Sequence, residues 1–568
     1  MDNITSRILT KVCNMDALIF PRYCQRLMPL LSVGCTRKRS VSRRTCAMLF
    51  GWVSLLLCNI SPAAVPGQFI AKMYTEVLGR APDPTGWKGA LGYFEPNGCN
   101  ATLLQTWGSQ FFTSTEFNSL QYDNDAITLI LYRAILNREP DANGYQHWLG
   151  VLNSGTPLAS VVADFFESSE FTQSVSSICS GTSYSFNNLG TGGLAIQIPA
   201  SGAGYSGLSE TQLQTLLDQT PSGGTVQLQQ KSVVYLDTTL YIPDGVTLTT
   251  YGAPTHNQHA FMARLVRSTP FANALVNVGN GTSSAALTNI WVDGQRQASN
   301  SYVLAAINVQ ITGGTAMTVS SNFISNSLGW TNVHGMGPLS GVQCNGYTIS
   351  NNVITAYPAM HAGVTSEYTD GISVGCQNAT IEGNQIVDPT DVGVVLFNSY
   401  PNVQQSIVSS NTIVSAGHSA FSALAYDTYY VTSPPAPSPS FAGASITSNT
   451  LWSSPNSHFI IGLAVGSLAW WGDRQSSGIY ADIGSGASAT DNTTAGILTN
   501  FGEGIAVSGM LSATVESNTF TGTLIPQSYT NCPIGNVLAS VSAGYASGSI
   551  QPYTDTTVID CMSDFGPN

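Results

Sequence analysis

A stretch of about two coils decides the fold of this chain: TISNNVI at residues 348–354 returns as TIEGNQI at 380–386 and as IVSSNTI at 407–413. In each copy an asparagine is followed two residues later by a large apolar residue. Seven asparagines follow this pattern, at intervals of 26–43 residues: Asn322, Asn352, Asn384, Asn411, Asn449, Asn492 and Asn518. Asn492 is the weaker member, because Thr494 takes the apolar position. A strand, a polar turn and a second strand repeating at this spacing predict stacked coils that bury their apolar faces against their neighbours.

The asparagines are predicted to be structural. A side-chain amide at a turn can satisfy backbone groups and can repeat from one coil to the next. The longer intervals indicate loop insertions, of which the Pro/Ser stretch at 433–440 is one.

A short helix is expected before the first coil. Ser209 and Gln212 have the spacing of a capping box, an amphipathic stretch runs to Leu217, and strand-like segments follow at 225–228 and 245–248. This order resembles the N-terminal cap and first coil of right-handed parallel β-helix proteins of the pectate-lyase superfamily. The resemblance implies that residues 208–568 form an all-β right-handed parallel β-helix whose open end the helix covers.

The region before the solenoid contains an internal repeat at an interval of about 58 residues. LGRAPDPTGW at 78–87 returns as LNREPDANGY at 136–145, and apolar residues recur at helical spacing around both copies. Residues 66–179 are therefore predicted to form an all-α module. It resembles a two-repeat extracellular domain of unknown function related to phycobilisome linkers. The resemblance implies attachment, for example to a cell surface, or assembly rather than chemistry. Residues 180–207, rich in Gly, Ser, Thr and Asn, are predicted to be a linker.

Residues 1–64 have the layout of a leader with a signal peptide. A basic cluster at 37–44 precedes an apolar run at about 46–58 and small residues near Ala63 and Ala64. The run is short for a membrane span, so cleavage is favoured over an N-terminal anchor. We expect a secreted or cell-surface protein, extracellular or periplasmic, with no transmembrane anchor after cleavage.

Six cysteines remain after the proposed cleavage site: Cys99, Cys179, Cys344, Cys376, Cys532 and Cys561. An even number in an exported chain permits disulfides. The pairings to test first are Cys344 with Cys376 and Cys532 with Cys561.

The charge distribution limits the possible partners. Only 9% of the 568 residues are charged, and the net charge of −13 lies entirely in residues 232–568, which contain no lysine and only four arginines. Those arginines are Arg264, Arg267, Arg296 and Arg474. A surface so poor in cations cannot neutralise a phosphate backbone, so nucleic acid is excluded as a partner.

Registering the coils on the asparagines suggests a candidate catalytic group. Asp391 and His418 each lie seven residues after a repeat asparagine, and Asp370 likewise precedes a strand. Equivalent positions on parallel strands are about 4.8 Å apart, so these three residues are predicted to form a ladder along one edge. Repulsion between two stacked carboxylates would raise the proton affinity of one of them, as general acid–base catalysis requires.

Residues nearby are predicted to bind substrate. The acids among them are further candidates for acid–base chemistry, and the aromatic rings are candidate stacking surfaces for sugars. They are Glu367, Tyr368, Asp388, Tyr400, Tyr426, Trp470, Trp471 and Arg474. Phe397, Tyr429 and Tyr430 could add further stacking surfaces. The other histidines of the solenoid, including His334, lack metal-type spacing and are predicted to be turn or core residues.

At these positions the chain resembles the polygalacturonase-type glycoside hydrolases. Thr369-Asp370-Gly371-Ile372 matches the family's first motif, Asp391 matches one member of its Asp-Asp pair, and Gly417-His418 matches part of its Gly-His-Gly. The resemblance implies that Asp370 and Asp391 are the acid–base residues and that His418 positions or tunes them. The family's Arg-Ile-Lys is missing, which favours a neutral glycan over a uronic-acid polymer.

The predicted activity is therefore hydrolysis of a polysaccharide without a cofactor. One alternative is β-elimination by a lyase, with calcium held by the acids around Glu367 and Asp388 and with His or Tyr as the base. Another is a non-catalytic adhesin or glycan-binding protein, because a scaffold does not fix a function.

Overall fold

The computed structural model describes residues 65–181, 196–279, 281, 283–295, 302–336, 344–355, 368–397, 403–427, 429–430, 440–466, 480–481, 484–507, 510–511, 513–524 and 537–538. All of them belong to one compact unit, Pro62–Asn568. The predicted leader, part of the predicted linker, and Cys532 and Cys561 lie outside the described residues.

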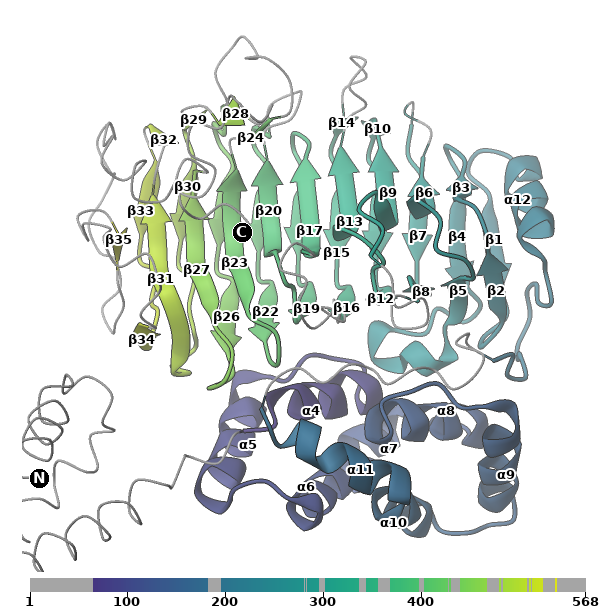
Figure 1. Ribbon diagram of the computed structural model, residues 1–568. Helices are drawn as coiled ribbons and strands as arrows, with labels where there is room; N and C mark the ends of the chain where they lie inside the picture. The colour runs from purple at the N-terminus through teal and green to yellow at the C-terminus, as the bar shows by residue number, and fades with distance from the viewer. Residues whose placement is uncertain are drawn as a thin grey trace, which may run out of the picture. The chain divides into compact units, whose positions relative to one another are not determined.

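Three long parallel sheets form the solenoid, and successive coils add one strand to each sheet in turn (Figure 1). Within the described residues, the last two coils add strands to the first and third sheets only. The first sheet comprises β1 (Thr225–Leu228), β4 (Thr247–Thr250), β7 (Ala286–Thr288), β11 (Thr318–Ser320), β15 (Thr348–Ser350), β18 (Thr380–Glu382), β21 (Ile407–Ser409), β25 (Ser445–Thr447), β30 (Ser488–Thr490) and β33 (Thr514–Glu516). The second comprises β2 (Val233–Leu236), β5 (Ala263–Arg267), β8 (Ile290–Asp293), β12 (Phe323–Ser325), β16 (Val353–Thr355), β19 (Gln385–Val387), β22 (Thr412–Ser415) and β26 (Thr450–Ser453).

The third sheet has the longest strands: β3 (Leu240–Ile242), β6 (Asn273–Val278), β9 (Ala306–Thr312), β13 (Thr331–Met336), β17 (Asp370–Gly375), β20 (Val392–Phe397), β23 (Ala420–Asp427), β27 (Phe459–Val465), β31 (Thr499–Val507) and β34 (Gly522–Leu524). Strand β35 (Val537–Leu538) pairs antiparallel with β31. Three short pairs stand apart: β10 (Gly314–Thr315) with β14 (Cys344–Asn345), β24 (Tyr429–Tyr430) with β28 (Tyr480–Ala481), and β29 (Gly484–Ser485) with β32 (Met510–Leu511). The predicted fold class, a right-handed parallel β-helix with an N-terminal all-α module, is confirmed.

The repeat asparagines form the corner between the first and second sheets. Each follows a residue with positive φ, such as Ser410 at 56° before Asn411. The backbone N–H and the side-chain amide of Asn384 both donate to Oδ1 of Asn411, each at 2.9 Å. The same two bonds link every consecutive pair from Asn322 to Asn518. The predicted ladder is confirmed, and Asn492 belongs to it.

Strand alternation fills the interior of the coils with apolar side chains. Ile349, Ile354 and Val374, one from each sheet, are fully buried in one continuous core. At the N-terminal end, α12 (Glu210–Gln219) begins with the expected capping box of Ser209 and Gln212. Its Leu213 and Leu217 join the same core, so the helix closes that end of the solenoid.

The helical region comprises α4 (Gly67–Lys72), η1 (Met73–Val77), α5 (Pro84–Asn97), α6 (Ala101–Thr113), α7 (Thr115–Leu120), α8 (Asn124–Ile135), α9 (Ala142–Asn153), α10 (Leu158–Glu167) and α11 (Ser169–Ile178). Its two halves repeat the same contacts. Arg80 pairs with Glu116 in the first half, as Arg138 pairs with Glu170 in the second. Among the described residues, no helix is long and apolar enough to cross a membrane.

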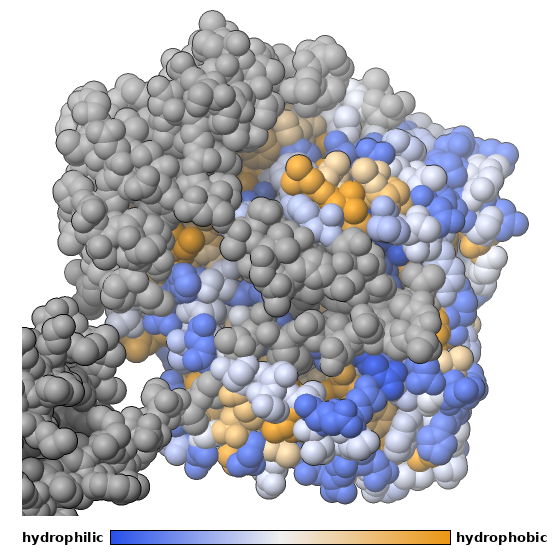
Figure 2. Space-filling model, viewed as in Figure 1, coloured by the Kyte–Doolittle hydropathy of each residue, from blue (hydrophilic) through white to orange (hydrophobic). Residues whose placement is uncertain are grey.

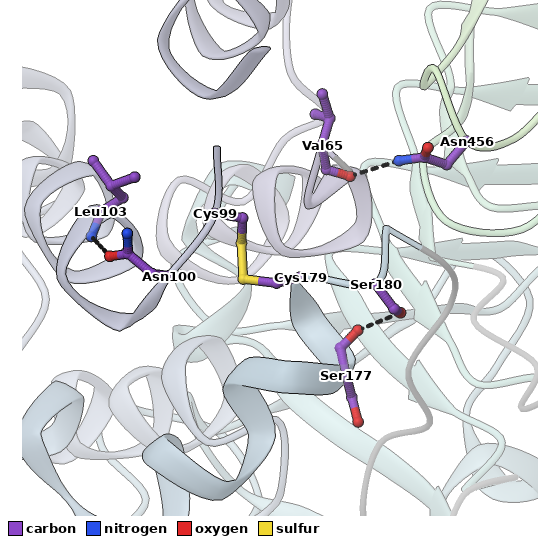
Figure 3. Close-up of a disulfide and its surroundings, with 8 residues drawn as sticks. All are labelled: Val65, Cys99, Asn100, Leu103, Ser177, Cys179, Ser180 and Asn456. Atoms are coloured by element: carbon purple, nitrogen blue, oxygen red, sulfur yellow. Dashed lines mark hydrogen bonds between the residues drawn. A yellow bond between two sulfur atoms is a disulfide. The ribbon is translucent and has the colours of Figure 1, made fainter. Parts of the chain in front are cut away.

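The predicted pairing of Cys344 with Cys376 is wrong. Both side chains are buried thiols in the solenoid core, where Cys344 Sγ lies 3.3 Å from the carbonyl oxygen of Gly375. The disulfide instead joins Cys99 to Cys179, across a sequence separation of 80 residues (Figure 3). It ties the segment between α5 and α6 to the end of α11, so it closes the helical region on itself.

Hydrophobic residues on the face drawn in Figure 2 form separate orange patches between blue and pale residues. Among the residues that the structure describes, the exposed large apolar side chains are Tyr205, Tyr241, Tyr251, Leu304, Ile407 and Leu498. Single exposed apolar side chains of this kind do not by themselves indicate a binding surface.

Candidate functional site

Asp370 and Asp391 meet at the start of two neighbouring strands of the third sheet. Asp370 is the first residue of β17, and Asp391 directly precedes β20. The N–H groups of Thr390 and Asp391 both donate to the carbonyl oxygen of Thr369 at 3.1 Å, which fastens one turn to the next. Asp370 Oδ1 accepts the N–H of Val392 at 3.0 Å, and its Oδ2 accepts the hydroxyl of Ser373.

The electrostatics of this pair favour a retained proton. Burial raises the pKa of Asp370 to about 7, although the bonds from Ser373 and Val392 act in the opposite direction. Burial raises the pKa of Asp391 well above its usual range, and the negative charges of Asp370 and Asp427 raise it further. Near neutral pH the group therefore holds at least one proton beside a potential carboxylate, as acid–base chemistry requires.

Asp427 is a third carboxyl of this site that the sequence did not reveal. It ends β23 and pairs in register with Phe397 of β20. Its charge raises the pKa of both Asp370 and Asp391. It has no motif and no fixed distance from a repeat asparagine. The strand pairing places it beside the last residue of β20, at the opposite end of that strand from Asp391, so its link to the pair is the effect of its charge.

The predicted three-residue ladder is wrong in its register. Val392 pairs with Ser422, so Asp391 lies one position before that row, whereas His418 lies four positions before it. Counted from the corner asparagines, the turn that holds His418 is three residues longer than the turn that holds Asp391. Equal spacing in sequence therefore does not give equal height on the strands.

Asp388 has a structural role in place of the predicted substrate contact. Its Oδ1 accepts the backbone N–H groups of Ala416, Gly417 and His418 at 2.6, 2.9 and 3.2 Å. Burial raises its pKa to about 6, while these three bonds and the charge of Lys72 act to lower it. A fully buried carboxylate that caps the turn of the next coil cannot reach a glycan.

Tyr426 is also removed from the predicted substrate contacts. Its ring is fully buried in the solenoid core, and its hydroxyl donates to the carbonyl oxygen of Ser488 at 2.6 Å. Tyr368 remains a candidate: it is half-buried, and the charge of Asp391 adds to burial in raising its pKa. Five predicted site residues lie outside the described part of the chain: Glu367, Tyr400, Trp470, Trp471 and Arg474.

An aromatic group adjoins the acids on the outer face of the third sheet. His334 pairs in register with Ser373, the residue that donates to Asp370. Its ring lies 4.6 Å from that of Trp330 and stacks on Phe397 at 5.7 Å. Burial lowers the pKa of His334 to about 3, and its buried Nδ1 has no hydrogen-bond partner among the described residues. The sequence predicts His334 to be a turn or core residue. Its relation to Asp370 depends on the pairing of β13 with β17, which spacing along the chain does not show.

The search for metal ligands covers only the described residues. Within them, no group of three or more His, Cys, Asp or Glu side chains is arranged to hold a metal ion. Glu367, one of the acids proposed for calcium, lies outside this part of the chain.

One comparison with known proteins matches part of the helical region. A family model described as a domain of unknown function, DUF4214, matches residues 108–175. No curated protein matches the chain.

Several solved structures are similar to part of this chain. An endo-xylogalacturonan hydrolase from Aspergillus tubingensis is 14% identical, with a TM-score of 0.31 over 61% of this chain and 99% of that one. An alginate lyase from Paenibacillus is 14% identical, with a TM-score of 0.31 over 50% and 93%. A double mutant of the tailspike protein of E. coli bacteriophage HK620, in complex with pentasaccharide, is 11% identical, with a TM-score of 0.32 over 62% and 63%. These likenesses concern the fold, and the function has to be argued from the site.

Proposed function

We propose that this protein is a polysaccharide hydrolase that works by carboxylic acid–base catalysis on the outer face of the third sheet. Asp391 is the general acid: its pKa lies well above the usual range, and its side chain is only partly buried. Asp370, with both oxygens oriented by hydrogen bonds, is the partner that acts as base or stabilises positive charge on the sugar. The observation that carries the proposal is that two aspartates lie at neighbouring strand starts, where Asp370 is held by Val392 and Ser373 and the pKa values of both aspartates are raised by burial and by neighbouring charge.

The distribution of cations supports a neutral glycan as the substrate. Arg267 donates to the carbonyl oxygens of Phe271, Asn273 and Ile307 and is buried. Arg264 is buried in ion pairs with two carboxylates. Neither arginine can bind the carboxylate of a uronic acid, and the other two arginines of the solenoid, Arg296 and Arg474, lie outside the described residues.

We propose export for this protein, which places the enzyme where polysaccharides occur. The disulfide between Cys99 and Cys179 is consistent with an oxidising compartment.

The test is an activity assay on a panel of neutral and acidic polysaccharides, following reducing ends and absorbance at about 235 nm, with and without chelator. Reducing ends without absorbance are expected for the wild type. Asp391→Asn should lower kcat by at least about 100-fold, because general acid catalysis contributes that much. Glu382→Gln, an exposed carboxylate of the first sheet, is the matched control and should keep full activity.

Three outcomes contradict the proposal. Absorbance that is lost on chelation would identify a metal-dependent lyase. Glycan binding without cleavage would identify a non-catalytic adhesin. Full activity in both Asp370→Asn and Asp391→Asn would show that these two residues are not catalytic, although the protein would still be a hydrolase.

A further inference from the structure

The helical region and the second sheet share one apolar interface. Val387, Val414 and Trp452 of the solenoid belong to the same buried cluster as the core of the helices. Trp452 is fully buried, and its ring lies 6.4 Å from that of Trp87 in α5. A second cluster joins Leu129 of α8 to residues of β8, β12 and β16. The outer face of this sheet would be a row of exposed apolar side chains without the helices.

A buried row of charges crosses the same interface. Glu76 and Glu139 both pair with Arg133 of α8. Glu139 also pairs with Arg264 of β5 at 2.7 Å, and Arg264 pairs in turn with Asp293 of β8. The side chains in this row are at most 4% exposed. Buried charges require close partners, so only one register of the helices on the sheet satisfies all five groups.

The ring of Trp291 in β8 lies beneath both guanidinium groups. The Arg264 Cζ atom is 3.9 Å from the ring centroid, and the Arg133 Cζ atom is 4.6 Å from it. A solenoid side chain therefore contacts one arginine from each part of the chain. Despite their burial, Glu76 and Asp293 keep pKa values below their usual ranges because of these arginines, so both of these carboxyls stay ionised.

Two glycines allow the backbones to meet. A Cβ atom on Gly67 would lie 2.2 Å from the carbonyl oxygen of Ala416, and one on Gly79 would lie 2.4 Å from that of Asn257. Hydrogen bonds also cross the interface at both ends. The side-chain amide of Asn456 donates to the carbonyl oxygen of Val65 at 3.0 Å, as Figure 3 shows. The N–H of Ala81 donates to the side chain of Gln385 at 2.7 Å.

We propose that the helical module is a lateral cover of the solenoid, which folds together with the second sheet and is held in register by the buried charges. Its partner is the outer face of the second sheet in the same chain. The resemblance to an attachment domain suggested a tethered unit, whereas close packing and shared ion pairs are typical of a single cooperative body.

The first test cuts the chain between the two parts without changing their contacts. A specific protease site is inserted between Gly192 and Gly193, and the cleaved protein is analysed by size-exclusion chromatography and thermal unfolding. The disulfide lies within the helical part and cannot hold the two fragments together. We expect the fragments to co-elute and to unfold in one transition. Two separate fragments that both keep a folded circular-dichroism spectrum would overturn the proposal.

The second test uses hydrogen–deuterium exchange on the uncut chain. Arg264→Met leaves Glu139 and Asp293 without their shared cation, so exchange in α8 and in β5 and β8 should become at least about tenfold faster in parallel. Arg138→Met removes a partly exposed pair inside the module and should leave the strands unchanged. Faster exchange in the helices alone, with protected strands, would show two independent units and would also contradict the proposal.

Discussion

Three aspartates of two neighbouring coils differ in role because their oxygens meet different partners. Asp388 gives one oxygen to three backbone N–H groups and is fully buried, so it caps a turn. Asp370 meets one N–H and one hydroxyl. Asp391 stays partly exposed beside the charges of two other carboxyls. Residue type alone therefore does not separate structural from chemical carboxyls.

The elevated pKa of Asp370 predicts how stability depends on pH. Its folded pKa of about 7 lies above the ordinary aspartate value of 3.8, so the folded state binds the proton more tightly. The resulting stabilisation is fully present below pH 4 and is lost as the pH rises through about 7.

Urea unfolding of wild type and Asp370→Asn from pH 4 to 8 would measure this effect. The amide cannot titrate, so the variant should lose less stability over this range. The Glu382→Gln control should retain the wild-type slope. An unchanged slope in Asp370→Asn would show that this carboxyl titrates normally.

At the scale of the element, the corner between the first and second sheets is the most regular feature. One residue with positive φ and one buried asparagine turn the chain in coil after coil. Each asparagine in the middle of the ladder donates to a carbonyl group of the previous coil as well as to its neighbour in the ladder, as Asn411 does to Ile381 and Asn449. Strand length varies much more than this corner, because the corner has to satisfy buried backbone groups.

Replacement of a central ladder residue should be costly. Asn411→Ala removes the acceptor of two bonds from Asn384. It also takes the side-chain donor from the carbonyl oxygen of Ile381 and leaves Asn449 Oδ1 with only the backbone N–H of residue 411. We expect a loss of about 3 kcal/mol in the free energy of unfolding, measured in urea. Asn118→Ala, exposed on α7, is the control and should change stability by less than about 0.5 kcal/mol. Equal losses of unfolding free energy in the two variants would show that the hydrogen bonds of the ladder do not stabilise the protein.

At the scale of the whole molecule, one face of the solenoid is covered by the helices and another carries the acids. The helices contact the turn between β22 of the second sheet and β23 of the third. A Cβ atom on Gly417 in this turn would lie 2.7 Å from the Cβ atom of Gln68 in α4. Lys72 of the same helix adds a positive charge near Asp388, whose carboxylate caps that turn. The helices therefore support the turns from which the third-sheet strands begin.

Two Gly→Ala substitutions in different helices distinguish the effect of this contact on stability from the effect of helix propensity. Gly67→Ala drives a methyl group into the carbonyl oxygen of Ala416 and should destabilise the protein by about 2 kcal/mol, the usual cost of overpacking. Gly92→Ala has open space around it in α5 and should be neutral or stabilising by up to about 1 kcal/mol. Thermal unfolding of both variants checks the difference. A neutral Gly67→Ala would mean that α4 is not held tightly against the solenoid.

Local patterns were enough to predict the fold class. The capping box of Ser209 and Gln212 acts within one helix, and the asparagine repeat and the duplicated helical motif recur along the chain, so all three can be recognised in the sequence. The same patterns could not predict the disulfide, because Cys99 and Cys179 are brought together only by the packing of the helices.

The sequence by itself determined the solenoid, its ladder of asparagines and the helical repeat, and it suggested the two aspartates of the candidate site. Tertiary structure alone decided which residues join them: Asp427 and His334 enter the group, and His418 and Tyr426 lie elsewhere. It also decided that the helices cover the second sheet. The physical reason is that strand register and the packing of separate elements depend on turn lengths and buried partners from distant coils, which spacing along one chain does not record.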